Sequence, residues 1–154
     1  MSFDNAEHLA QQLKNEIRNS LKLTCSIGIS PNKLLSKIAS DFKKPDGLTT
    51  VKPEQVEQFL SPLKIREIPG IGKKTEDVFT QMDIHIIEEL RKIDVFDLNK
   101  MFGRKTGGYI FNSAKGIDTE IVKERPPTIQ FSKIVTLKKN SKELDSSTCL
   151  LYTS

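Results

Sequence analysis

The residues with the most specific chemistry in this 154-residue sequence form one segment, Ile68-Pro69-Gly70-Ile71-Gly72-Lys73-Lys74-Thr75. It lies between two stretches whose apolar spacing predicts short helices, an order typical of a helix-hairpin-helix. Glycines allow the backbone to turn tightly with positive φ and to come close to a ligand. The N–H groups of such a turn, together with the start of the next helix, can bind a DNA phosphate. We therefore predict a DNA-binding site that consists of Gly70, Ile71, Gly72, Lys73, Lys74 and Thr75.

A purely structural hairpin is the alternative for this segment. Glycines at a turn between helices can serve the geometry of the turn alone. Glu76 and Asp77 follow the two lysines directly, and they could satisfy the helix terminus themselves or repel a phosphate. The flanking apolar residues favour the phosphate-binding hairpin, because they fit the helices on both sides of it: Ile65, Ile68, Val78 and Phe79.

Lys37 is a second candidate, because a lysine on an exposed helical stripe could hold the triphosphate of a nucleotide. Lys33, Lys37 and Asp41 follow one another at intervals of four residues within a predicted helix. The alternative is a surface ion pair between Lys37 and Asp41, which would contribute roughly 0.3–0.5 kcal/mol. From spacing alone, the surface pair is the better explanation.

The elements that must position these residues begin with an alternation of helix and strand. Apolar residues at helical spacing predict an amphipathic helix over residues 6–21, and alternating apolar residues predict a strand over 23–29. Ser30-Pro31-Asn32 offers an N-cap for a helix over 33–42. We expect that helix to bury Leu34, Leu35, Ile38 and Phe42. Lys44-Pro45-Asp46-Gly47 is a strong helix breaker and predicts the first domain boundary.

After this boundary the chain is expected to be helical. Pro53 suits the first turn of a helix. Short helical segments are predicted around residues 64–68, 73–82, 86–93, 96–102 and 105–115. Short helices with tight connectors predict a compact helical bundle. Residues 118–128 read as an exposed linker, and the apolar residues around 134–137 suggest a strand that opens another domain.

Composition narrows the class of protein. Hydrophobic residues make up 36% and charged residues 29%, as in ordinary globular chains. The sequence shows no apolar run that predicts a membrane span and no signal-peptide pattern, so we expect a cytoplasmic protein. Cys25 and Cys149 lie far apart, without the spacing of metal ligands, and we expect both to be reduced thiols.

Charge is distributed unevenly along the chain. The net charge is +4, yet residues 100–142 contain ten Lys and Arg against three acids, a net +7. The remaining 14 basic and 17 acidic residues sum to −3. A basic segment of this kind fits binding to nucleic acid, and a solvated lysine-rich surface explains it equally well.

Four motifs in consecutive order resemble Y-family DNA polymerases, and the DinB branch in particular. Residues 24–47 resemble the late palm of that family, and residues 68–73 resemble the hairpin of its thumb. Gly116-Ile117-Asp118 resembles the end of the thumb, and residues 133–141 resemble the first strand of an archaeal little finger. The resemblance covers the chain from about residue 24 to residue 144.

This resemblance implies an α+β fold. The expected parts are a palm remnant (helix-strand-helix) over 1–44, a helical thumb over 45–119, a linker over 120–129 and a truncated little finger over 130–154. It also implies that Lys37 contacts the triphosphate of the incoming nucleotide and that Gly70, Ile71 and Gly72 lie at DNA phosphates. Along the template backbone it places Lys133, Thr136 and Lys138. The implied enzyme is a monomeric translesion polymerase that uses Mg²⁺ and dNTPs on primer–template DNA, with a sliding clamp as a further partner.

The catalytic carboxylates of the family have no counterpart in this sequence. Family members hold two Mg²⁺ ions through an N-terminal Asp and a later Asp-Glu pair in a strand. The acidic pairs Glu76-Asp77 and Glu88-Glu89 fall instead on predicted helix surfaces. We therefore expect a fragment that begins just after the Asp-Glu strand, departs from the family pattern from about residue 145, and is inactive alone.

Two other functional classes remain as alternatives. The hairpin also resembles that of endonuclease-III-type DNA glycosylases, in which the lysine matched by Lys74 forms a Schiff base. Those enzymes also need a downstream Gly-Pro-x-Asp segment, which the sequence lacks, and that reading would leave the palm-like motif unexplained. A non-catalytic DNA-binding module that contains polymerase segments is the other alternative.

Overall fold

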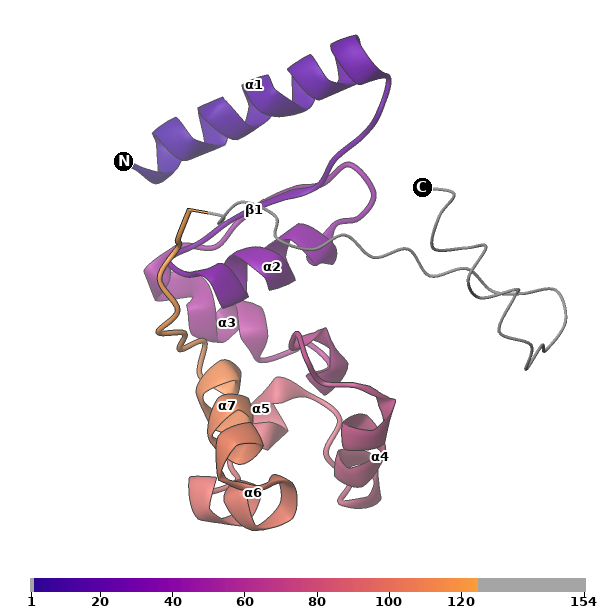
Figure 1. The fold of residues 1–154 in the computed structure, drawn as a ribbon, viewed down its shortest axis with the longest axis vertical. Coiled ribbons are helices and arrows are strands. Elements are labelled where there is room, and N and C mark those ends of the chain that lie inside the picture. Colours follow the sequence, from indigo (N-terminus) through magenta and orange to yellow (C-terminus); the bar gives the residue numbers. More distant parts are fainter. Residues whose placement is uncertain (1, 125–154) are drawn as a thin grey trace, which may run out of the picture. The chain divides into compact units, whose positions relative to one another are not determined.

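The computed structural model describes residues 2–124. The first elements are α1 (Phe3–Leu21), β1 (Ile27–Ile29), α2 (Lys33–Phe42) and β2 (Leu48–Thr50). They are followed in the described residues by seven helices: the 3₁₀ helix η1 (Pro53–Gln55), α3 (Val56–Leu60), the 3₁₀ helix η2 (Ile65–Glu67), α4 (Lys73–Gln81), α5 (Ile87–Leu90), α6 (Val95–Phe102) and α7 (Arg104–Ala114). All of them belong to one compact unit, Met1–Val122 (Figure 1). The predicted α+β class is confirmed, and the strand expected near residues 134–137 lies outside the described residues.

The first helix confirms the expected boundaries but not the expected burial. Ser2 caps α1 by accepting a hydrogen bond from the N–H of Asn5, and the helix ends at Lys22, which is in the left-handed region. Its buried side is formed by Ala10 and Lys14, while Leu9 and Leu13 are 43% and 44% exposed. The described sheet has two strands and therefore offers no broad apolar face to the leucine stripe.

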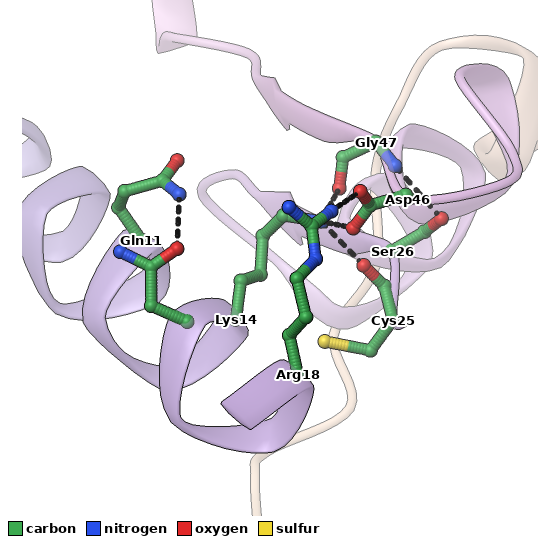
Figure 2. A network of polar contacts seen from close by, with 8 residues as sticks. Gln11, Lys14, Arg18, Cys25, Ser26, Asp46 and Gly47 are labelled. Carbon is green, nitrogen blue, oxygen red and sulfur yellow. Dashed lines mark hydrogen bonds and ion pairs between the residues drawn. The ribbon is translucent and has the colours of Figure 1, made fainter. Parts of the chain in front are cut away.

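A buried lysine joins α1 to the start of both strands. The Lys14 ammonium donates to the carbonyls of Cys25 (2.5 Å) and Gly47 (3.3 Å) and to the Asp46 carboxylate (2.6 Å). Figure 2 shows the Arg18 side chain, one turn further along α1, directed at the same carboxylate. The hydrogen bond from Lys14, and to a smaller extent the charge of Arg18, holds the pKa of Asp46 below its ordinary value. This polar cluster takes the place of apolar contacts along that side of α1.

The sheet pairs β1 with β2 in parallel, with Ile27 opposite Leu48 and Ile29 opposite Thr50. Helix α2 forms the crossover between them, as parallel strands require. The sequence prediction missed β2 and extended β1 too far toward residue 23. Gly28 allows α2 to lie close to β1, because a Cβ there would collide with the backbone of the helix at Ser36.

Helix α2 is capped as predicted, since the Asn32 side chain accepts from the N–H of Leu35 at 2.9 Å. Leu34, Leu35 and Ile38 are buried, as expected. The prediction for Phe42 was wrong, because this side chain remains 50% exposed. Its ring packs edge-on against Phe59 with 5.3 Å between centroids, at the rim of the core rather than inside it.

The succession of short helices after Pro53 is confirmed. They surround one apolar cluster, which includes Leu60, Ile65, Ile68, Phe79, Ile87, Leu90, Leu98 and Ile110. Gly107 lets α7 lie directly against α6, since a Cβ there would come within 2.5 Å of the Leu98 backbone. None of the helices in residues 2–124 is long and apolar enough to cross a membrane.

Candidate nucleic-acid interface

The hairpin between η2 and α4 is built around a tight turn from Ile68 to Ile71. The N–H of Ile71 donates to the carbonyl of Ile68 at 3.1 Å, and Gly70 has φ +86°. Pro69 at the second position, with a positive φ at the third, identifies a type II turn. The side chains of Ile68 and Ile71 are buried and anchor the turn in the core.

Helix α4 begins at Lys73 without a side-chain cap, with Gly72 at the N-cap position. The carbonyl of Gly72 accepts from the N–H groups of Thr75 and Glu76, at 3.1 and 3.0 Å. Within residues 2–124, the N–H groups of Gly70, Gly72, Lys73 and Lys74 have no recorded hydrogen-bond partner. Both lysine side chains are exposed beside these amides. The arrangement presents several donors and positive charge in one place, which suits an anionic oxygen.

The two glycines of the hairpin differ, which corrects the expectation of positive φ at both. Gly72 has φ −92° and ψ 177°, an extended conformation that any residue adopts. A Cβ at Gly72 would meet no atom within 4 Å. Gly70 is therefore required by the turn itself, whereas the protein around Gly72 leaves that backbone open to an approaching group.

The acidic residue nearest the hairpin already has a partner. The Glu76 carboxylate accepts from the Arg66 guanidinium of η2 at 3.2 Å. Its negative charge is thus offset by Arg66, which weakens the objection that it would repel a phosphate. Asp77 is exposed.

Tyr109 of α7 supports the hairpin from the other side. Its hydroxyl donates to the carbonyl of Pro69 at 2.6 Å. Sequence reasoning missed this residue, because no local pattern connects two positions that lie forty residues apart.

Lys37 lies on the exposed side of α2, where its ammonium pairs with Asp41 at 2.8 Å. Lys44 contacts the same carboxylate at 2.5 Å. Hydrogen bonds from Lys37 and then Lys44 hold the pKa of Asp41 below its ordinary value. The structure therefore contains the surface pair that spacing predicted.

The same lysine also borders a cavity of about 370 Å³ that reaches the hairpin. The residues around it come from α2, the hairpin, α7 and the segment after α7: Lys33, Leu34, Lys37, Pro69, Tyr109, Asn112, Ile117, Asp118, Thr119 and Glu120. At one edge the Lys33 ammonium pairs with Glu120 at 2.6 Å, and this pair raises the pKa of Lys33. Lys37 therefore lines a cavity together with Pro69 of the hairpin, whereas none of the predicted DNA-binding residues from Gly70 to Thr75 lines it.

Two side-chain contacts fix the distance between α2 and the end of α7. The Asn32 amide donates to the carbonyl of Gly116 at 2.8 Å, and the Asp118 carboxylate accepts from the N–H of Leu34 at 3.0 Å. Gly116 has φ +71° in a buried position where a Cβ would meet Val56. The segment expected to be an exposed linker is therefore tied to α2 at Asp118, and it is exposed from residue 119 to residue 124.

The remaining candidates are placed as follows. No three His, Cys, Asp or Glu side chains converge in residues 2–124 as a metal site would need. Glu89 instead accepts from the N–H groups of His85 and Ile86, which hold its pKa below the ordinary value. Lys133, Thr136 and Lys138 lie outside the described residues.

Comparisons with known proteins give consistent matches. The family described as "DNA polymerase-iota, thumb domain" matches residues 66–118, and the "impB/mucB/samB family" matches residues 1–41. A protein named DNA polymerase IV from Nitrosopumilus maritimus is 66% identical over 143 residues, which is 93% of this chain and 39% of that protein. DNA polymerase IV from Methanosarcina acetivorans is 44% identical over 139 residues, 90% of this chain and 38% of that protein.

Solved structures agree with these sequence matches. The crystal structure of DinB from Sulfolobus solfataricus is 34% identical with a TM-score of 0.68, and the match covers 75% of this chain and 34% of that one. An insertion ternary complex of Dbh DNA polymerase is 34% identical with a TM-score of 0.72, covering 79% and 36%. The chain thus spans less than two fifths of the length of these relatives.

Proposed function

Because this chain belongs to the Y-family of DinB-like DNA polymerases, we propose that it serves as the DNA-gripping part of a translesion polymerase. The observation that carries the proposal is the uncapped start of α4 beside the type II turn, with Lys73 and Lys74 exposed next to unpaired amides. A phosphate of duplex DNA is the ligand that this surface fits. Contacts of this kind position the protein on the backbone and read no sequence.

We further propose how the chain divides. Residues 1–44 form the late palm, 45–119 the thumb, 120–129 a linker and 130–154 the start of the little finger. The pairing of β2 with β1 departs from this division at its first boundary, because it joins Leu48–Thr50 to the strand of the palm part. Along the template backbone, the proposed contacts are Lys133, Thr136 and Lys138.

Lys37 is proposed to contact the triphosphate of the incoming dNTP. Its position at a cavity that Pro69 of the hairpin also lines supports this role, because a nucleotide bound there would lie beside the hairpin. The pair with Asp41 is exposed and therefore weak, so a triphosphate could replace it.

The complete polymerase is proposed to use Mg²⁺, which would act as a Lewis acid and stabilise the charge that develops on the triphosphate. Residues 2–124 do not offer a fitting ligand set, so the metal would be held by other carboxylates of that enzyme. Primer–template DNA is the proposed macromolecular partner, with a sliding clamp as a further one, and the enzyme is proposed to act as a cytoplasmic monomer. A glycosylase role for Lys74 is not favoured, because the relatives named above are polymerases.

A salt titration tests the hairpin assignment. We expect the 154-residue chain to bind fluorescent duplex DNA, and Lys73→Ala and Lys74→Ala each to reduce the slope of log K against log salt by about 1. Lys92→Ala, at an exposed position after α5, serves as the matched control and should leave the slope unchanged. Equal slopes for the parent and both hairpin variants would contradict the proposal.

A further inference from the structure

We propose that Tyr109 is a positioning residue that selects the orientation of the Pro69–Gly70 peptide and so directs the Gly70 N–H toward the DNA phosphate. This inference rests on the proposed function of the hairpin. It concerns a residue of α7 that lies outside both the turn and α4, so the sequence of the hairpin does not point to it.

The contact is short and specific. The Tyr109 hydroxyl donates to the Pro69 carbonyl at 2.6 Å. The ring also lies beside the next residue, since a Cβ built at Gly70 would be 3.6 Å from Cε1 and 3.9 Å from the hydroxyl oxygen of Tyr109. Tyr109 therefore bonds one residue of the central peptide of the turn and lies beside the other.

That peptide is the one whose orientation distinguishes two common turns. Type I and type II turns differ in the direction of the central peptide, and only type II needs positive φ at the third position. Glycine at position 70 is able to adopt either conformation. In a planar trans peptide the C=O and the N–H point to opposite sides. Holding the Pro69 carbonyl toward Tyr109 therefore directs the Gly70 N–H to the side away from Tyr109.

The Gly70 N–H is the amide that this orientation leaves available. It has no recorded acceptor among residues 2–124, and the N–H groups of Gly72, Lys73 and Lys74 follow it along the chain. A peptide flip would replace this donor with the Pro69 carbonyl, whose partial negative charge would repel a phosphate. The orientation chosen by Tyr109 thus decides whether the turn attracts or repels the backbone of DNA.

Tyr109 itself is not needed to hold the core together. It is 42% exposed, whereas Gly107, Ile110 and Ala114 form the buried side of α7. Removing the hydroxyl while keeping the ring should therefore leave the fold intact. Tyr109→Phe therefore tests the hydrogen bond to Pro69 without disturbing the packing of α7.

The first measurement compares the affinity of the parent chain and Tyr109→Phe for duplex DNA. We expect a loss of about three- to tenfold, since one intramolecular hydrogen bond that stabilises the binding-competent turn is removed, and little change in thermal midpoint. Thr80→Val is the matched control, because it removes a hydroxyl that donates only to the Glu76 carbonyl within α4. In NMR spectra of the free proteins, the strong NOE between Pro69 Hα and Gly70 H^N that marks a type II turn should weaken only in Tyr109→Phe.

A double-mutant cycle with Gly72→Val separates positioning from direct contact. If Tyr109 acts through the hairpin, Tyr109→Phe should cost little further affinity once Gly72→Val has blocked the hairpin. Additive losses would overturn the inference, because Tyr109 would then contact the DNA itself. Unchanged affinity and NOE in Tyr109→Phe, with a loss in Gly72→Val, would also overturn it while leaving the proposed function in place. Unchanged affinity in Gly72→Val alone would overturn the proposed function and this inference together.

Discussion

At the scale of single residues, the hairpin contains two glycines, of which only Gly70 has positive φ. Valine at Gly70 would be forced into a region that costs a β-branched residue about 1–3 kcal/mol. Valine at Gly72 meets no neighbouring atom at Cβ and keeps its ordinary extended conformation. We therefore expect Gly70→Val to lower the thermal midpoint and Gly72→Val to leave it nearly unchanged.

DNA affinity should not follow thermal stability in these variants, because Gly72→Val is expected to bind DNA weakly although it stays stable. The added side chain at Gly72 would occupy the space in front of the unpaired amides, so we expect at least a tenfold loss of affinity without a loss of stability. Fluorescence anisotropy with duplex DNA and a thermal melt provide the two readouts. Binding by Gly72→Val at the affinity of the parent would show that the glycine is not required by a ligand.

Lys37 is expected to act on nucleotide binding and not on stability. Its side chain is 56% exposed and its pair with Asp41 contributes at most roughly 0.5 kcal/mol. In a polymerase that contains this segment, Lys37→Ala should raise the KM for dNTP severalfold and shift the thermal midpoint very little. Lys43→Ala, at the residue that follows α2, is the control and should leave KM unchanged. An unchanged KM in Lys37→Ala would remove the assignment.

At the scale of elements, the cluster of Lys14, Arg18 and Asp46 predicts how stability depends on pH. The pKa of Asp46 is lowered, so the carboxylate contributes stability that is fully present above its ordinary pKa near 3.8. That contribution is lost as the pH falls through the lowered folded-state pKa. We expect Asp46→Asn to be less stable than the parent at neutral pH and to approach it below about pH 4.

Thermal melts from pH 7 to pH 2 measure this difference. Asp97→Asn is the matched control, since Asp97 is exposed and has no ion pair or side-chain hydrogen bond among residues 2–124, and this variant should track the parent across the titration. A gap between parent and Asp46→Asn that persists unchanged into acid would contradict the role given to the carboxylate.

Another pair of elements owes its arrangement to Asn32 and Asp118. These two side chains join the start of α2 to the end of α7. Lys37 lies one turn after this junction on α2, and Tyr109 lies on α7. The shape of the shared cavity therefore depends on two polar contacts as well as on the apolar core.

At the scale of the whole molecule, we expect the isolated chain to bind primer–template DNA without sequence preference and to add no nucleotide to it. If roughly three or four phosphates are neutralised, log K against log salt should fall with a slope of about −3 to −4. Extension is not expected, because the sequence has no counterpart of the Asp-Glu strand of the family and two-metal transfer depends on such carboxylates. A primer-extension gel with Mg²⁺, run beside filter binding, tests both statements. Extension by the purified chain, or binding that ignores salt, would contradict them.

Much of this protein could be predicted from the sequence because the deciding interactions are local. The Asn32 cap, the breaker before Gly47, the short helices after Pro53 and the hairpin at Gly70 depend on residues a few positions apart. The resemblance to Y-family polymerases was confirmed for the same reason, since its motifs are contiguous segments.

What the sequence could not determine depends on residues far apart in the chain. The pairing of β2 with β1, the buried position of Lys14 and the contact of Tyr109 with Pro69 join positions 21 to 40 residues apart. Gly70 and Gly72 cannot be told apart by residue type, and only their backbone conformations distinguish them. Tertiary structure alone decided these features, because a lysine or a tyrosine on a helix has no local signal for the carbonyl that it will meet after folding.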